Sequence, residues 1–207
     1  ARPDHMNHDE LAGLYAGGAT RLAPDTLAGA GLDAHACAWL LDPGLPMRPD
    51  PAVAFVEFVP PAIHRSPGGA MLVFAREPWA DALWLAIAAD GRVVTAGEDA
   101  APLFVNTRVE HFLHFLAALQ RFQAEASRLD AGPRVYSQSE MQARLDALRR
   151  GEFVRRHQPA AGSEPPSFDR PAALRQLDLT WQQHDAKALR RGGWWCRIRE
   201  QLRDGLL

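Results

Sequence analysis

Glu110, His111 and His114 are the residues of this chain whose types and spacing come nearest to a metal site. They stand in the stretch LFVNTRVEHFLHFLAAL, residues 103–119, whose apolar positions recur at helical spacing. Zinc helices of the H-E-x-x-H type place two histidines four residues apart, with the glutamate directly after the first. Here the order is Glu-His-x-x-His and the histidines are three residues apart, so the pattern misses that motif.

Two interpretations of these histidines remain open. In the first, His111 and His114 serve a metal-dependent hydrolase, although the other histidines are scattered singly and offer no third ligand in the sequence. In the second, which we favour, both line the polar edge of an amphipathic helix whose apolar stripe faces the core. Motifs such as G-x-S-x-G and phosphate-binding glycine loops are also missing from the sequence. We therefore expect no metal, no cofactor and no catalytic residue, and a protein that binds rather than an enzyme.

The helix that carries these residues has a recognisable start. Thr107 and Glu110 fit a capping box, in which the hydroxyl and the carboxylate each accept a hydrogen bond from a backbone amide, and Asn106 is an alternative N-cap. The apolar stripe that follows predicts a long helix, which ends by Gly132-Pro133 because proline cannot continue it. The stripe is made of Val109, Phe112, Leu113, Phe115, Leu116, Leu119 and Phe122.

The residues before this helix predict two more helices and a run of strands. Asn7 and Glu10 fit a capping pair for a short first helix, which Gly17 and Gly18 end. Asp33 is the expected N-cap of a helix over HACAWLL, which must end at the prolines of DPGLP. Asp90-Gly91 between two apolar runs predicts a tight β-hairpin. The expected strands cover residues 53–59, 70–75, 83–89, 92–96 and 102–105.

The C-terminal part has a different, more helical character. Residues 137–156 form a charged amphipathic pattern, residues 157–167 are rich in proline, and two further helical patterns are separated by Gly192-Gly193. We expect an α+β domain over residues 1–131 and a helical extension over residues 132–207 that packs on it.

Arginine and tryptophan occur together in this extension, where Trp181, Trp194 and Trp195 offer surfaces for stacking bases. Ile198 and Leu202 follow Trp194 at steps of four residues, which is typical of a helix face packed against a neighbouring helix. We favour the packing interpretation and expect no direct contact with nucleic acid.

Composition and charge indicate in which cellular compartment the protein works and which kinds of partner it binds. The first 100 residues hold 13 acidic and 6 basic residues, whereas the rest hold 12 and 17, so the net charges are about −7 and +5. The two cysteines form no disulfide framework. The N-terminal residues have no apolar segment, and no run of about 18 apolar residues exists that would cross a membrane. We expect a cytoplasmic protein without a membrane partner.

Three motifs in this order resemble the SUKH superfamily of bacterial immunity proteins, and most closely its fourth subfamily. They are Gly44, Leu45 and Pro46 after a helix, the Asp-Gly hairpin, and the stretch FVNTRVEHFLHFL. Val105, Asn106 and Thr107 stand where that subfamily has a V-N-S-S-type turn, with Arg108 in place of the second small hydroxyl residue. The resemblance covers residues 20–125.

The resemblance implies an α+β fold with a mixed, mostly antiparallel sheet flanked by helices. It also implies a non-enzymatic protein that binds and neutralises a polymorphic toxin used in competition between bacteria, often a nuclease or a deaminase acting on nucleic acid. A regulatory scaffold of the same fold is the alternative function. The family provides no fixed contact residues, since its members meet their toxins through different surfaces.

Acidic residues of the first half give an independent expectation for the toxin-binding surface. A toxin that handles nucleic acid needs a basic cleft, and an acidic inhibitor is attracted to such a cleft at long range. Two loops, residues 76–81 and 97–100, combine acidic side chains with a tryptophan that is suited to anchor an interface. The candidate residues are Glu77, Trp79, Asp81, Glu98 and Asp99.

Overall fold

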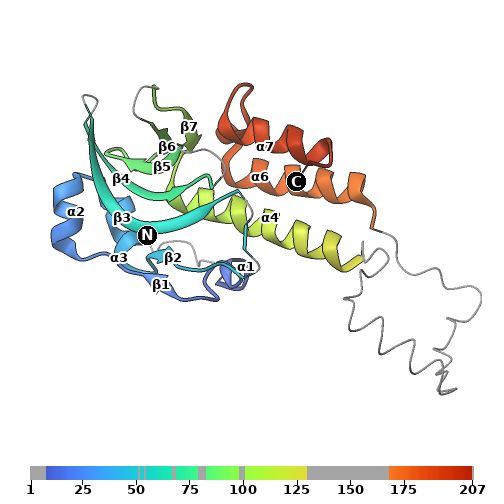
Figure 1. The fold of residues 1–207 in the computed structure, drawn as a ribbon, viewed down its shortest axis with the longest axis horizontal. Coiled ribbons are helices and arrows are strands. Elements are labelled where there is room, and N and C mark those ends of the chain that lie inside the picture. The colour runs from blue at the N-terminus through green and yellow to red at the C-terminus, as the bar shows by residue number, and fades with distance from the viewer. Residues whose placement is uncertain are drawn as a thin grey trace, which may run out of the picture.

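The computed structural model describes most of the chain and combines sheets with helices (Figure 1). The described residues are 8–50, 52–53, 55–66, 69–78, 83–97, 101–129 and 168–206. A five-stranded sheet and a two-stranded sheet pack with helices, so the predicted α+β class is confirmed. All strand pairs among the described residues are antiparallel. No described helix is both long enough and apolar enough to traverse a membrane.

The large sheet is a meander in which each strand pairs with its neighbour in sequence, in the order β3-β4-β5-β6-β7. The predicted Asp90-Gly91 hairpin is confirmed, because β5 and β6 pair across it and Gly91 has a φ of +79°. The strands are β3 (Glu57–Ser66), β4 (Gly69–Arg76), β5 (Trp84–Ala88), β6 (Val93–Ala96) and β7 (Phe104–Asn106).

The extent predicted for the first of these strands was wrong. Residues 53–59 were expected to form it, but β3 begins at Glu57 and continues to Ser66 through Pro60 and Pro61. Proline lacks the N–H that a ladder needs and is therefore tolerated on an edge strand, which is the position of β3. The register with β4 shifts between Phe58 and Ala62, where the prolines stand. The edge position, which the local pattern does not show, accounts for the longer strand.

The N-terminal residues form short elements that lie beside the sheet. Asp33 caps α3 as predicted, since its Oδ1 accepts a hydrogen bond of 2.7 Å from the amide of Ala36. The helix α2 was not predicted, although Pro24 at its first position and the left-handed Gly31 after its end are usual signals. The elements are α1 (His8–Leu11), β1 (Ala19–Thr20), α2 (Pro24–Ala30), α3 (Ala34–Leu41) and β2 (Leu45–Pro46).

Gly44, Leu45 and Pro46 have a structural role in this region. Leu45 and Pro46 form β2 and pair with β1, while Gly44 turns the chain with a φ of +88°. The Tyr15 hydroxyl donates a hydrogen bond of 2.8 Å to the carbonyl of Gly44. Burial raises the pKa of Tyr15, so this hydroxyl keeps its proton and remains a donor. A Cβ at Gly44 would lie 2.4 Å from the carbonyl oxygen of Thr20, so only glycine fits here.

Replacing Gly44 with alanine is expected to lower the free energy of unfolding by about 2 kcal/mol, from backbone strain together with the clash against Thr20. Gly31→Ala is the matched control, because Gly31 has a φ of +64° but no atom within 4 Å of the place that a Cβ would occupy. The control carries only the cost of the left-handed conformation, about 1 kcal/mol. Urea denaturation measures both variants, and equal losses would contradict the role of the close approach to Thr20.

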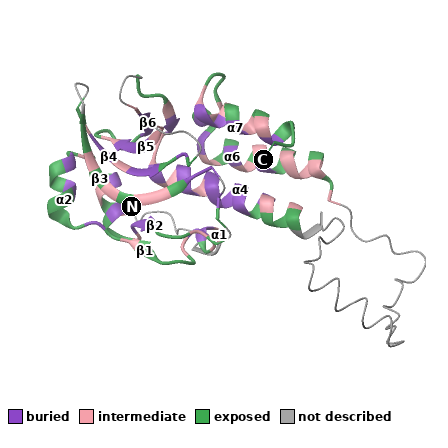
Figure 2. Cartoon of the chain, in the orientation of Figure 1, coloured by how far each residue is buried: buried purple, intermediate pink, exposed green. Residues whose placement is uncertain are grey.

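The long helix α4 (Val109–Leu129) forms the centre of the hydrophobic core. The predicted apolar stripe is confirmed, since its seven side chains are all buried, and Figure 2 shows the buried part of α4 against the sheet. The C-terminal helices α6 (Arg170–Asp185), η1 (Ala186–Leu189) and α7 (Trp194–Arg203) complete the same core. The break predicted at Gly192-Gly193 separates η1 from α7, as expected.

The tryptophans of these helices are core residues. Trp181 and Trp195 are fully buried, and the Trp181 ring stacks on Phe115 with centroids 5.2 Å apart. Buried rings cannot stack on bases, so the packing interpretation of the tryptophans is confirmed. The boundary proposed at residues 131–132 and the helix predicted over residues 137–156 lie outside the described residues.

Candidate functional site

The two faces of the large sheet differ in what covers them. Alternate residues of a strand point to opposite faces, and in β5 Leu85 and Ile87 point to the main core beneath the helices. On the other face a second apolar cluster gathers, and within the part of the chain that the structure describes none of its residues comes from a helix. This cluster, which we call the open face, consists of Met71, Val73, Trp84, Ala86, Ala88, Val94 and Ala96.

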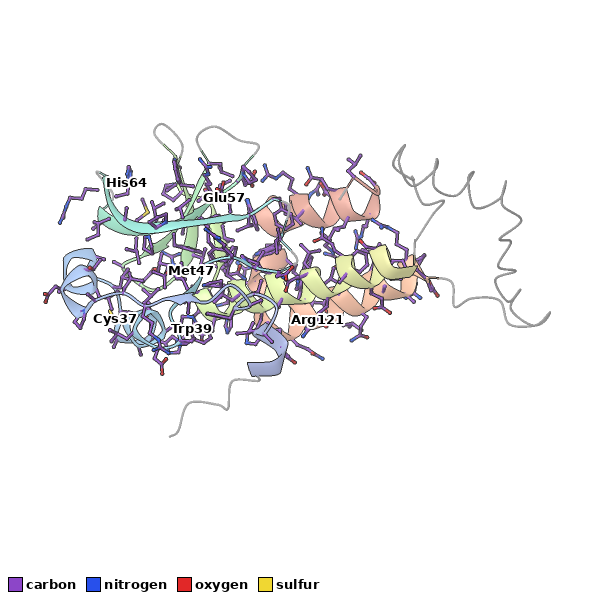
Figure 3. All side chains as sticks on the ribbon, turned by 60° about the horizontal axis from the view of Figure 1, so that its bottom comes forward. Cys37, Trp39, Met47, Glu57, His64 and Arg121 are labelled. Carbon is purple, nitrogen blue, oxygen red and sulfur yellow. The ribbon has the colours of Figure 1, made fainter. Side chains whose placement is uncertain are left out.

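The open face holds a cavity of about 480 Å³ that is open to solvent and lined mainly by apolar atoms. One wall is formed by the edge strand β3, which carries the residues Glu57 and His64 that are labelled in Figure 3. Trp84 is half-buried beside it and presents a large aromatic surface. The cavity is lined by Val59, Pro60, Ala62, Ile63, His64, Val73, Trp84, Ala96 and Gly97.

Of the five residues that the sequence suggested for the toxin-binding surface, only Glu77 lies in the described part of the chain. Glu77 is 8% exposed, accepts a hydrogen bond from the Trp194 indole and pairs with Arg197. Its carboxylate therefore holds α7 against the sheet and is not presented to a partner. Trp79, Asp81, Glu98 and Asp99 lie outside the described residues.

A second cavity, of about 470 Å³, is cationic. It lies between β7 and the C-terminal helices and is lined by Arg92, Lys187, Arg190 and Arg191, among others. A basic toxin cleft would be repelled by these side chains. This cavity therefore fits the expected partner worse than the open face does.

Asn106 and Thr107, the polar residues of the motif that opens α4, are bonded to the C-terminal helices. Trp195 donates a hydrogen bond of 2.7 Å from its indole to Oδ1 of Asn106, which is completely buried. Asp185 accepts hydrogen bonds from the amide of Thr107 at 2.6 Å, from its hydroxyl at 3.0 Å and from Nδ2 of Asn106 at 3.3 Å. The motif is therefore structural, since it fixes α6 and α7 to the start of α4.

Asp185 remains ionised in this network. Burial by itself raises the pKa of a carboxyl group, but the nearby His111 ring and the hydrogen bonds from Thr107 and Asn106 outweigh it and lower the pKa of Asp185 to about 2. An anion beside the first turn of α4 also interacts favourably with the helix dipole. Asp185 thus fixes the residues that lead into α4 to the end of α6.

The capping box predicted from Thr107 and Glu110 was wrong. The Thr107 hydroxyl donates to Asp185, and the Glu110 carboxylate binds Nε2 of His35 at 2.6 Å instead of the start of its own helix. His35 belongs to α3, so the pair links two helices that are adjacent in space but separated in sequence. Asp185 therefore occupies the Thr107 hydroxyl that the box was expected to use.

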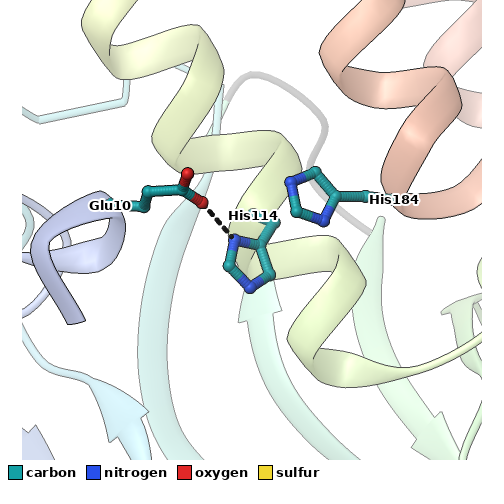
Figure 4. Close-up of side chains that lie close together, drawn as sticks. All are labelled: Glu10, His114 and His184. Carbon is teal, nitrogen blue, oxygen red and sulfur yellow. Dashed lines mark ion pairs between the residues drawn. The ribbon is translucent and has the colours of Figure 1, made fainter. Parts of the chain in front are cut away.

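The two histidines of α4 face different neighbours. His111 lies with Nδ1 3.8 Å from Oδ2 of Asp185. His114 stacks on His184 of α6, with ring centroids 4.2 Å apart and 9° between the planes, and its Nδ1 lies 3.4 Å from Oε2 of Glu10. One ligand atom from each of Glu10, His114 and His184 lies within 4.8 Å of the other two. Figure 4 shows these three side chains close together. The sequence around His114 could not indicate these neighbours, because Glu10 and His184 belong to helices that are distant along the chain.

Both stacked histidines are neutral at neutral pH. Burial, followed by the nearby His184, lowers the pKa of His114 to about 4 against the opposing effect of Glu10. Burial also lowers the pKa of His184. Neutral imidazoles are the form that stacks without repulsion and the form that offers a lone pair to a ligand.

A sequence model of the SUKH-4 immunity protein family matches residues 6–168. The match includes both sheets and α1 to α4, together with the motifs at Gly44 and Asn106. No curated protein and no solved structure matches the chain.

Proposed function

The chain belongs to the SUKH-4 immunity protein family, and we propose on this basis that it neutralises a cognate toxin by direct binding, without catalysing a reaction. The family match carries this proposal. The cytoplasm is the compartment in which such a protein meets a toxin that has entered the cell. Binding alone is sufficient for the function, because a bound immunity protein keeps the substrate out of the toxin's active site.

We assign the toxin contact to the open face. An interface needs a desolvated apolar centre, and aromatic side chains in pockets supply most of its binding energy. The open face offers such a centre, with Trp84 beside a cavity of about 480 Å³ and Val73 and Ala62 on its walls. The helices occupy the other face with the main core, so binding here requires no rearrangement of α4, α6 or α7.

The toxin is proposed to act on nucleic acid as a nuclease or deaminase. The excess of acidic residues in the first half of the chain supports this, because it complements the basic cleft of such enzymes. Complexes between nuclease toxins and their immunity proteins reach a Kd on the order of 10⁻¹³ M or below. Gly97 lines the cavity and Glu98 and Asp99 follow it in sequence, so these acidic residues remain candidates for the rim.

Growth rescue tests the proposed function. The toxin domain encoded by the neighbouring gene is expressed in a host cell with this protein, with an empty vector, or with an unrelated immunity protein as the control. We expect growth only with this protein, together with a stable complex in size-exclusion chromatography. Continued killing with every adjacent toxin domain, despite soluble protein, would favour the regulatory scaffold.

The two loops at residues 76–81 and 97–100 are tested separately with Trp79→Ala and Asp99→Arg variants. We expect each to weaken toxin capture in a pull-down by about tenfold, through loss of an aromatic anchor and reversal of a favourable charge. Glu77→Gln is a different case, because Glu77 is bonded to Trp194 and Arg197, and it should lower stability instead. Full capture by the Trp79 and Asp99 variants would remove the two loops from the interface while leaving the open face in place.

A further inference from the structure

We propose that Glu10, His114 and His184 form a binding site for a divalent transition metal ion, with Zn²⁺ as the best-fitting ion. The site shares no residue with the cavity of the open face, to which the toxin contact is assigned under the proposed function. It revises the prediction of no metal, which depended on ligands being found near one another in sequence.

The three side chains come from three elements that pack together. Glu10 is on α1, His114 on α4 and His184 on α6, and Figure 4 shows the carboxylate and the two imidazole rings close to one another. Their nearest ligand atoms all lie within 4.8 Å of one another, and Nδ1 of His114 is 3.4 Å from Oε2 of Glu10. Two ligand atoms of a tetrahedral zinc ion are about 3.3 Å apart, from bonds of about 2.0–2.1 Å. The separation between His114 and Glu10 already has this value.

The donor set matches zinc chemistry. Two imidazole nitrogens and one carboxylate oxygen are a frequent set of three protein ligands, with water completing the tetrahedron. Imidazole suits zinc and its neighbours in the first transition row, whereas Mg²⁺ and Ca²⁺ prefer oxygen ligands alone. Glu10 also supplies a negative charge that partly offsets the charge of the ion.

Metal binding needs a movement of the rings. His114 and His184 are nearly parallel, so their lone pairs do not yet converge. Rotation about the side-chain dihedrals would direct one nitrogen of each ring to a common point. Both side chains are only partly buried, and neither His114 nor His184 belongs to the hydrophobic core that the rotation would disturb.

The surroundings favour neutral rings over a charged pair. Besides Glu10, the charged or titratable groups that act on the two histidines are His111, Glu110 and Arg121. A metal ion binds neutral imidazole and does not have to displace a proton from it at neutral pH. The ion would connect α1 to the α4–α6 pair and so stabilise the N-terminal helix, which has only four residues.

The test is direct metal binding to the full chain after treatment with a chelator. Zn²⁺ is titrated by calorimetry, and Co²⁺ is titrated as a spectroscopic probe whose visible absorption reports tetrahedral geometry. We expect one ion per chain, a tetrahedral Co²⁺ spectrum and a melting temperature that rises with the concentration of Zn²⁺. His114→Gln and His184→Gln should each weaken Zn²⁺ binding by about 100-fold, because each removes one ligand. Unchanged Zn²⁺ affinity in both variants would overturn the site.

Two further variants make the result specific. His64→Gln is the control, because His64 is an exposed histidine on β3 that does not belong to the cluster. The Zn²⁺ affinity of this variant should equal that of the unaltered chain. His184→Cys keeps a ligand atom and should retain Co²⁺ binding with a new thiolate-to-cobalt absorption band. Absence of that band, in a variant whose circular dichroism shows that it is folded, also counts against the site. Growth rescue by His184→Gln is expected to persist, so failure of the metal site leaves the proposed function intact.

Discussion

Replacing Ala62 with arginine is expected to weaken binding of the cognate toxin by on the order of 1000-fold, because a large charged side chain would fill the cavity of the open face and lose its hydration in the interface. Ala62 is exposed and lies on the edge strand, so arginine is accommodated in the free protein. Surface plasmon resonance with the purified toxin domain measures the loss, and growth rescue should fail in parallel.

Ala28→Arg provides the matched control for this substitution. Ala28 is exposed on α2, on a helix that packs with the core face of the sheet, and the change in size and charge is the same. We expect toxin affinity within about twofold of the unaltered chain, a difference typical of a neutral surface change. Equal affinities for the two arginine variants would place the toxin contact elsewhere than on the open face.

Asp185→Ala is expected to lower the free energy of unfolding by about 3 kcal/mol, because it leaves the Thr107 amide and the Asn106 side chain without their charged acceptor. Asp185 is 6% exposed, so water cannot fully replace the lost hydrogen bonds. The loss should appear as a lower midpoint of urea denaturation with an unchanged slope.

Glu125→Ala is the control for removal of one acidic side chain. Glu125 is exposed on α4 and should change stability by no more than about 0.5 kcal/mol. If Asp185→Ala were as mild as this control, the network around Asn106 would not be what holds the C-terminal helices to α4.

The parts of the fold that follow local patterns could be predicted from the sequence. The hairpin at Asp90-Gly91 depends on turn residues between two apolar runs, and Asp33 caps the helix that directly follows it. The apolar stripe of α4 was predicted because a helix in a core needs a broad apolar face. In each case the residues that determine the structure are neighbours along the chain.

The features that could not be predicted depend on contacts between distant elements. Glu77 was expected at the surface because it is acidic and follows a strand, but Trp194 and Arg197 neutralise and bury it. Thr107 bonds to Asp185 and Glu110 bonds to His35, and no local pattern indicates either partner. The cluster of Glu10, His114 and His184 likewise exists only in the folded chain, so closely spaced ligands in the sequence could not indicate it.

The way in which α7 completes the core has a consequence for biosynthesis. Each strand of the large sheet pairs with its neighbour in sequence, so the meander can form while the ribosome is still translating. Trp194 and Trp195 cover Phe112 and Phe115 from a segment much later in the chain, so they emerge from the ribosome after the sheet and α4. We therefore expect the nascent protein to expose an apolar aromatic surface on α4 until α7 has been synthesised, and to need chaperones during that interval.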